Sequence, residues 1–73
     1  KITYTEFCEN RDDVYNLINQ GYKLIIYLDD SFVVDFSEMQ ILNLFSYIVI
    51  NKNLKKYDEI MDNKVVLSNI VEI

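Results

Sequence analysis

The sequence predicts a single small α/β domain, and three observations indicate this class. Short apolar runs rich in Ile, Val and Tyr suit strands. Apolar residues at helical spacing lie between them, and polar turns separate the segments. We therefore expect one domain spanning residues 1–73. It should be an α/β sandwich with a small mixed sheet of four to five strands and two helices, in the order β-α-β-α-β-β with an optional last strand.

The first half of the chain is expected to form a strand, a helix and a second strand. The segment ITYTEF, residues 2–7, alternates in the way that suits a strand. Asn10 is a suitable N-cap for a helix with carboxylates in its first turn. Gly21, the only glycine, is where that helix should end in a left-handed conformation. The run YKLIIYL, residues 22–28, predicts a central strand.

The second half is expected to hold one long helix followed by two or three strands. Residues 32–36 fit either a short strand or a loop. Ser37 is a suitable N-cap, Gln40 fits a capping box, and the helix should run to about Val49. A polar turn precedes an expected strand that starts with residues 54–57. A second polar turn leads to an expected strand at residues 64–68, and residues 70–73 could extend the sheet at its end.

The expected helix over residues 37–49 has too much apolar surface for one contact. At about 100° per residue, its apolar side chains fill an arc of roughly 160°, while covering one sheet takes little more than 100°. These side chains are Ile41, Leu42, Leu44, Phe45, Ile48 and Val49. Either the first helix or the same helix of a second copy could cover the surplus. In the second case, the interface would be self-complementary.

Composition excludes several classes of function. The net charge of −5 argues against nucleic-acid binding, which depends on neutralising phosphates, and against direct contact with an anionic membrane. With one Cys and no His, the chain offers neither a zinc site nor an activated thiol, so we expect no cofactor and no catalytic residue. The carboxylates Asp29, Asp30 and Asp35 fit a solvated strand end better than a metal site.

One basic concentration stands out in the sequence. It consists of Lys52, Lys55 and Lys56. Lysines on an edge strand protect against aggregation. They could instead capture an acidic or C-terminal peptide beside an apolar groove formed with Tyr57, Val65 and Val66. The sequence leaves both interpretations open.

Several segments together resemble a known family. They are the strand ITYTEF, the helix start at Arg11–Asp12–Asp13, the Gly21 break before KLIIYLDD, the helix ILNLFSYIVI with Phe45–Ser46, and the tail LKKYDEIMDNKVVLSNIVEI. In this order they resemble the C-terminal domain of SepF, a family of bacterial cell-division proteins. The likeness spans essentially the whole chain, although the sequence lacks the glycines that the family carries after the position of Ser46.

The resemblance implies a non-enzymatic adaptor that forms homodimers or polymers. Such an adaptor would bind the C-terminal peptide of the division GTPase FtsZ and link it to the membrane through a segment outside this chain. It would work in the cytoplasm, at the division site. By position, Leu42, Phe45 and Val49 would form the dimer interface, and Lys55, Lys56 and Val66 would bind the peptide.

Two other classes of function remain as alternatives. The first is a generic regulatory or protein-interaction module, similar to the STAS type and belonging to a larger protein. The second is a metalloenzyme based on carboxylates such as Asp30 and Asp35.

Overall fold

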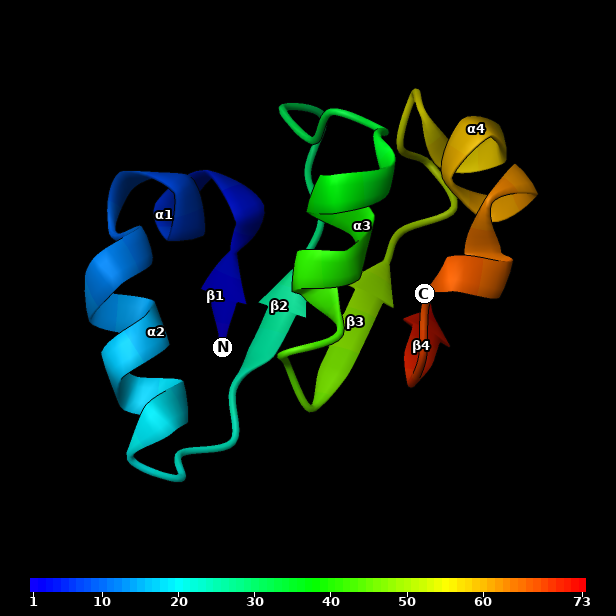
Figure 1. Ribbon diagram of the computed structural model, residues 1–73. Helices are drawn as coiled ribbons and strands as arrows, with labels where there is room; N and C mark the ends of the chain where they lie inside the picture. The colour runs from blue at the N-terminus through cyan, green and yellow to red at the C-terminus, as the bar shows by residue number, and fades with distance from the viewer.

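The fold is built on a four-stranded parallel sheet whose strands lie in chain order, β1-β2-β3-β4. The computed structural model describes all residues, 1–73. Figure 1 shows α3 lying across β2 and β3, with the other helices toward the two ends of the sheet. The strands are β1 (Ile2–Thr3), β2 (Ile25–Tyr27), β3 (Tyr47–Ile50) and β4 (Ile70–Glu72). The helices are α1 (Tyr4–Glu9), α2 (Arg11–Asn19), α3 (Phe36–Leu42), α4 (Tyr57–Asp62) and the 3₁₀-helix η1 (Lys64–Val66).

The four strands repeat one register. Ile2 pairs with Ile26, Ile26 with Ile48, and Ile48 with Ile70, so equivalent positions recur every 22 to 24 residues. Each repeat consists of a strand and a helical return. This period falls within the range of about 20–29 residues found for solenoids built from strand-plus-helix units. The chain therefore stacks short units side by side, and each unit contacts mainly its neighbours.

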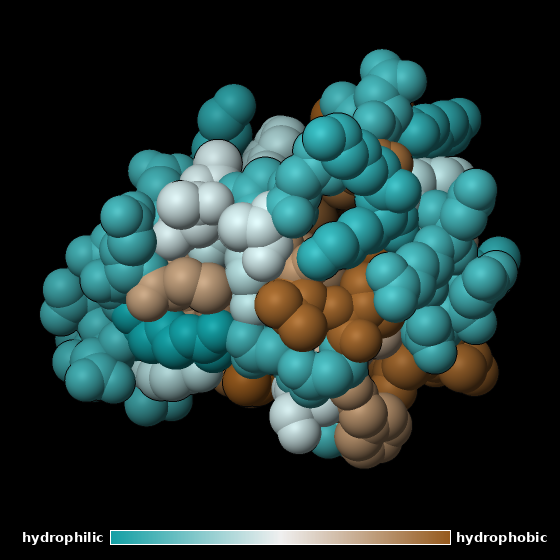
Figure 2. All heavy atoms as spheres, turned by 90° about the horizontal axis from the view of Figure 1, so that it is seen from above, coloured by the Kyte–Doolittle hydropathy of each residue, from teal (hydrophilic) through white to brown (hydrophobic).

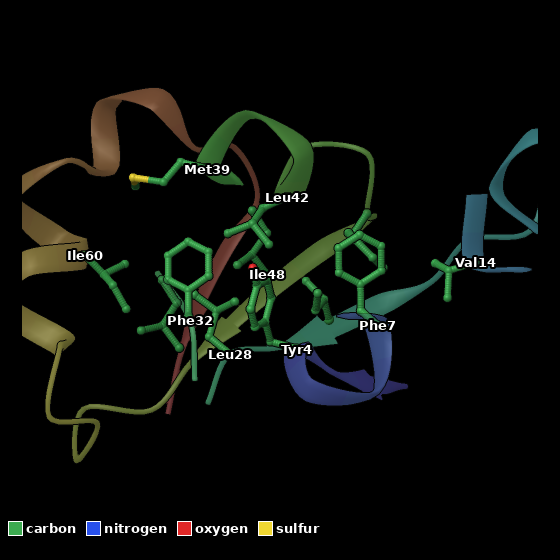
Figure 3. Packing of buried hydrophobic residues seen from close by; sticks show 12 residues of the cluster. Tyr4, Phe7, Val14, Leu28, Phe32, Met39, Leu42, Ile48 and Ile60 are labelled. Carbon is green, nitrogen blue, oxygen red and sulfur yellow. The ribbon is translucent and has the colours of Figure 1, made fainter. Parts of the chain in front are cut away.

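The hydrophobic core lies between the helices and one face of the sheet. Figure 3 shows Leu42 and Met39 of α3 above Phe32, Leu28 and Ile48, with Ile60 at one end and Val14 at the other. No polar or charged residue is buried there. The cluster comprises Tyr4, Phe7, Val14, Ile26, Leu28, Phe32, Met39, Leu42, Phe45, Ile48, Ile50 and Ile60.

A polar cluster above this core ties the first two helices to α3. The Tyr4 hydroxyl donates a hydrogen bond to Glu38, and Arg11 forms an ion pair with the same carboxylate. The Arg11 guanidinium also lies 4.6 Å from the centroid of the Phe7 ring. Arg11 lowers the pKa of Glu38, and the hydrogen bond from Tyr4 adds to the effect. Burial, followed by the hydrogen bond to Glu38, raises the pKa of Tyr4.

Local capping explains where the helices begin and end. Thr3 starts α1 with a complete capping box, in which its hydroxyl accepts from Glu6 N while its own N–H donates to the Glu6 carboxylate. Asp35 caps α3 by accepting from Glu38 N. Gly21, with φ of +96°, follows α2 in the left-handed region that favours glycine.

The structure confirms the predicted α/β class and several of its elements. The sheet has four strands. A helix at residues 11–19 is followed by the Gly21 break, a strand at residues 25–27 falls within the predicted 22–28, and the last strand is at residues 70–72. Residues 32–35 form the loop that was one of the two options for that segment.

Other elements were predicted wrongly. The sheet is parallel rather than mixed, and there are four α-helices rather than two. The capping box at Thr3 converts most of the expected first strand into α1. The expected strands at residues 54–57 and 64–68 are instead the approach to α4 and the 3₁₀-helix η1. One continuous helix over residues 37–49 does not exist, because α3 ends at Leu42 and β3 begins at Tyr47.

This last difference also corrects the expected dimer interface. Leu42 is 0% exposed and Phe45 is 3% exposed, and both belong to the core of one chain. Val49 is 5% exposed but lies outside the core cluster, on the other face of the sheet. The three side chains therefore do not share a surface that a second copy could contact. The surplus apolar arc disappears because the second half of the expected helix is a turn over residues 43–46 followed by the start of β3.

Two neighbouring leucines provide a test of this core. Leu42→Ala should lower the free energy of unfolding by about 2–5 kcal/mol, because it opens a cavity under α3. Leu44→Ala is the matched control, since Leu44 is 52% exposed and should change stability by no more than about 0.5 kcal/mol. Urea denaturation followed by circular dichroism measures both variants. Equal losses in the two variants would contradict the observed end of α3.

Candidate functional site

The face of the sheet that lies opposite the helices carries the candidate site. Side chains alternate between faces along a strand, so the neighbours of the core isoleucines point away from the helices. We call this surface the open sheet face. It comprises Thr3, Ile25, Tyr27, Tyr47, Val49 and Val71, and none of these residues packs against the core cluster.

The open sheet face is largely apolar and partly accessible. Tyr27, Val49 and Val71 lie in one row across three strands. Val49, at the centre of this row, is almost covered by its neighbours, whereas Tyr47 is 51% exposed and Val71 is 39% exposed. The Lys1 ammonium lies 4.9 Å from the centroid of the Tyr27 ring. The surface thus offers aromatic and β-branched side chains to a partner.

A cleft of about 290 Å³ opens where β2 and β3 end. Viewed from above, toward the ends of the strands, the molecule shows hydrophobic residues exposed among hydrophilic ones (Figure 2). Both charged residues that line the cleft are aspartates, and its apolar side chains come from the end of β2, from β3, from the turn after β3 and from the residue after β4. The lining consists of Tyr27, Leu28, Asp29, Asp30, Val49, Asn51, Asn53, Leu54 and Ile73.

Asp29 is a fixed structural part of the cleft wall. Its Oδ2 accepts from Thr5 N (3.0 Å) and Thr5 Oγ1 (2.7 Å), and its Oδ1 accepts from Ser31 N (3.1 Å). Burial by itself would raise the pKa of Asp29, but the hydrogen bonds from Ser31 and Thr5 outweigh it and lower the pKa. Asp29 therefore carries a negative charge and connects the first turn of α1 to the turn that follows β2.

Asp30 is the more available carboxylate of the pair. It is exposed and accepts one backbone hydrogen bond, from Lys55 N to Oδ1 (3.0 Å). This bond joins the turn after β2 to the turn after β3. Asp30 thus places a negative charge at the edge of an apolar cleft, where a cationic group could approach it.

The residues expected to bind a peptide do not form one site. Lys55 is exposed and follows Leu54 of the cleft wall. The ammonium of Lys56 donates to the carbonyl of Phe32 (2.7 Å), so this lysine anchors the loop before α3. Val66 packs against the core cluster, and its carbonyl accepts from Asn43 Nδ2 (2.8 Å). Only Lys55 is placed to meet a partner near the cleft.

Other chemically active groups do not assemble into a second site. Cys8 is exposed, and Arg11 lies 3.4 Å from its sulfur. No three carboxylates or thiols come close enough together to hold a metal ion. None of the helices combines the length and the apolar character needed to cross a bilayer.

The comparisons with protein-family models, with curated proteins and with solved structures each found no match.

The pH dependence of stability tests the role of Asp29. Its pKa is depressed in the folded state, so its contribution is full above its ordinary pKa of 3.8 and is lost as the pH falls through the folded value. Asp29→Ala should therefore lower the free energy of unfolding at neutral pH by about 1–3 kcal/mol, because donors from Thr5 and Ser31 lose their acceptor. The difference from the parent should shrink as the pH falls below 3.8.

Urea denaturation at neutral pH and at a pH below 3.8 measures this effect. Asp62→Ala is the control, because it removes a carboxylate from an exposed position. A deficit of the same size at neutral and acidic pH would show that the Asp29 charge contributes nothing.

Proposed function

We propose that this chain is a non-enzymatic protein-interaction module whose cleft binds an extended partner segment carrying a basic side chain. The observation that carries the proposal is the cleft at the ends of β2 and β3, with its apolar side chains and its two aspartates. The proposal agrees with the more general of the predicted functions, a regulatory or protein-interaction module.

The chemistry of the cleft favours lysine or arginine from the partner. Both side chains have an apolar stem and a charged end. The stem would lie against Tyr27, Val49 and Leu54, and the charged end would approach Asp30. The net charge of −5 would also attract a basic partner over longer distances, most strongly at low salt. A volume of about 290 Å³ is at the small end for ligand sites, which suits one or two side chains.

The hydrogen bonds and the ion pair of Asp29 and Glu38 argue against a catalytic role for these two carboxylates. General acid–base chemistry needs a titratable group that can exchange protons with a substrate. Both oxygens of Asp29 are held by donors from Thr5 and Ser31, and Glu38 is paired with Arg11 on the other side of the sheet. These contacts stabilise the fold and keep both groups ionised.

A pair of peptides tests the proposed preference. The probe is an extended peptide with one lysine among valine and threonine residues, and its twin has glutamine in place of lysine. Asp30→Asn can keep the hydrogen bond from Lys55 N while it removes the charge. This variant should bind the lysine peptide about two- to fivefold more weakly, as expected for a partly exposed ion pair. Isothermal titration calorimetry gives the affinities.

Asp62→Asn serves as the matched control, because it removes one negative charge from an exposed position in α4. It should leave the affinity for the lysine peptide unchanged. Equal binding of the two peptides by the parent, or equal losses in the two variants, would overturn the assignment of the cleft.

The division-adaptor function implied by the resemblance is a second proposal. In it, the partner is the C-terminal peptide of FtsZ and the site of action is the division ring. Its support in the structure is Lys55, an exposed residue that follows Leu54 of the cleft wall. Lys55→Ala should then weaken binding of that peptide severalfold. Lys56→Ala should chiefly lower stability, because Lys56 already donates to Phe32 O.

Fluorescence anisotropy with a labelled FtsZ C-terminal peptide measures this binding, and Lys64→Ala is the control at an exposed position in η1. If the parent domain does not bind the peptide, the division function is excluded while the basic-segment proposal is unaffected.

A further inference from the structure

The two edges of the sheet differ in whether their backbone groups are free. At the β1 edge the strand is only two residues long, and the chain turns directly into α1. The N–H of Thr3 donates to the Glu6 carboxylate at 2.9 Å. A strand approaching this edge would have to break the capping box that begins α1. The β1 edge is therefore closed by its own sequence, as edge strands in natural sheets often are.

The β4 edge has no such protection. Asn69 O accepts from Ile48 N, Ile73 N donates to Ile50 O, and Ile73 O accepts from Lys52 N. The odd-numbered residues of this strand thus bond to β3. Because the direction of the backbone groups alternates along a strand, the N–H and C=O groups of Ile70 and Glu72 point away from the sheet. No hydrogen bond within the chain satisfies them.

Apolar side chains accompany these free groups. Val71 is 39% exposed in the middle of the strand, and Ile73 is 56% exposed just after it. Val65, in the 3₁₀-helix that leads into β4, is 93% exposed. Figure 1 places β4 at the opposite end of the sheet from β1, with no strand beyond it. An edge that combines free backbone groups with exposed apolar side chains is a template for pairing with another strand.

We propose that this edge is a homodimer interface, in which β4 pairs antiparallel with β4 of a second copy around a two-fold axis at Val71. In this register Ile70 lies opposite Glu72 of the partner. The two residues form a hydrogen-bonded antiparallel pair, which uses the groups that point outward. Val71 lies opposite its own copy in a non-hydrogen-bonded pair, where side chains approach most closely.

The structure favours a second copy in this arrangement over head-to-tail stacking. Head-to-tail stacking would need β4 of one copy to pair with β1 of the next, and the engaged N–H of Thr3 opposes that. A two-fold pair uses only the free edge on both copies, and such an interface is self-complementary by symmetry. A core this small also gains stability from self-association. The dimer joins two four-stranded sheets into one continuous sheet.

Proline at position 72 tests the pairing directly, because it removes one outward-pointing N–H. Glu72→Ala is the matched control: both variants lose the carboxylate that accepts from the Tyr57 hydroxyl, but only alanine keeps the N–H. Sedimentation velocity at concentrations on the order of tens of micromolar should show dimers for the parent and for Glu72→Ala. The same experiment should show Glu72→Pro as a monomer.

A second pair of variants covers the outcome in which Glu72→Pro fails to fold. Val71→Lys puts two ammonium groups opposite each other across the two-fold axis and should give a folded monomer. Val33→Lys adds the same charge at a loop position that is 57% exposed, and it should leave the dimer intact. A monomeric parent would overturn the proposal, and so would folded Glu72→Pro or Val71→Lys that still sediments as a dimer. Asp30→Asn should not affect dimerisation, because Asp30 lies in the turn after β2 and not at the β4 edge.

Discussion

The parallel row formed by Ile26, Ile48 and their partners in β1 and β4 is the constraint on which the rest of the structure depends. Strands that follow one another in order and run parallel must be joined by crossovers, and crossovers in one sheet share a hand. Returns of the same hand between successive strands place every helix on the same face of the sheet. The core therefore forms on that face alone, around the buried Ile26 and Ile48. The other face is left uncovered, and the last strand is left with a free edge.

The turns on either side of the strands maintain this spacing through side chains. Asn43 accepts from Ser68 N and donates to Val66 O, which joins the end of α3 to the segment that enters β4. At the other end of the strands, Asp29 receives donors from Thr5, and Asp30 receives the N–H of Lys55. Each polar side chain thus connects one repeat to the next. The same two aspartates line the cleft, so the groups that define the repeat also give the proposed binding site its charge.

The sequence predicted those elements whose signals are local. The Ile-rich strand at residues 25–27 and the helix that ends before Gly21 depend on nearby residues, and both were predicted. The capping box of Thr3 and Glu6 is also a local signal and could have predicted α1. The segment at residues 41–50 was different, because its apolar residues fit a helix as well as a helix followed by a strand. The run of Tyr47 to Ile50 favours a strand by propensity, but its pairing with β2 and β4 decides the matter and joins residues 22 positions apart.

The candidate site was harder to predict for the same reason. Asp29 and Asp30 could be recognised as the end of a strand, but their cleft combines side chains from segments as distant as Tyr27 and Ile73. The bond between Lys56 and the Phe32 carbonyl also depends on the tertiary arrangement. Because Lys55 and Lys56 are adjacent in the sequence, they were expected to act together. The sequence alone did not reveal that Lys56 anchors the loop before α3.

The conformation of residues 47–50 is the central claim, because the open sheet face, the cleft and the β4 edge all require β3 to be the third strand of a parallel sheet. Nuclear magnetic resonance of the uniformly labelled domain tests it most directly. We expect strand-type Cα and Cβ shifts from Tyr47 to Ile50, with cross-strand contacts between backbone protons of Ile48 and those near Ile26 and Ile70. Helical shifts running through to Val49 without those contacts would contradict the account.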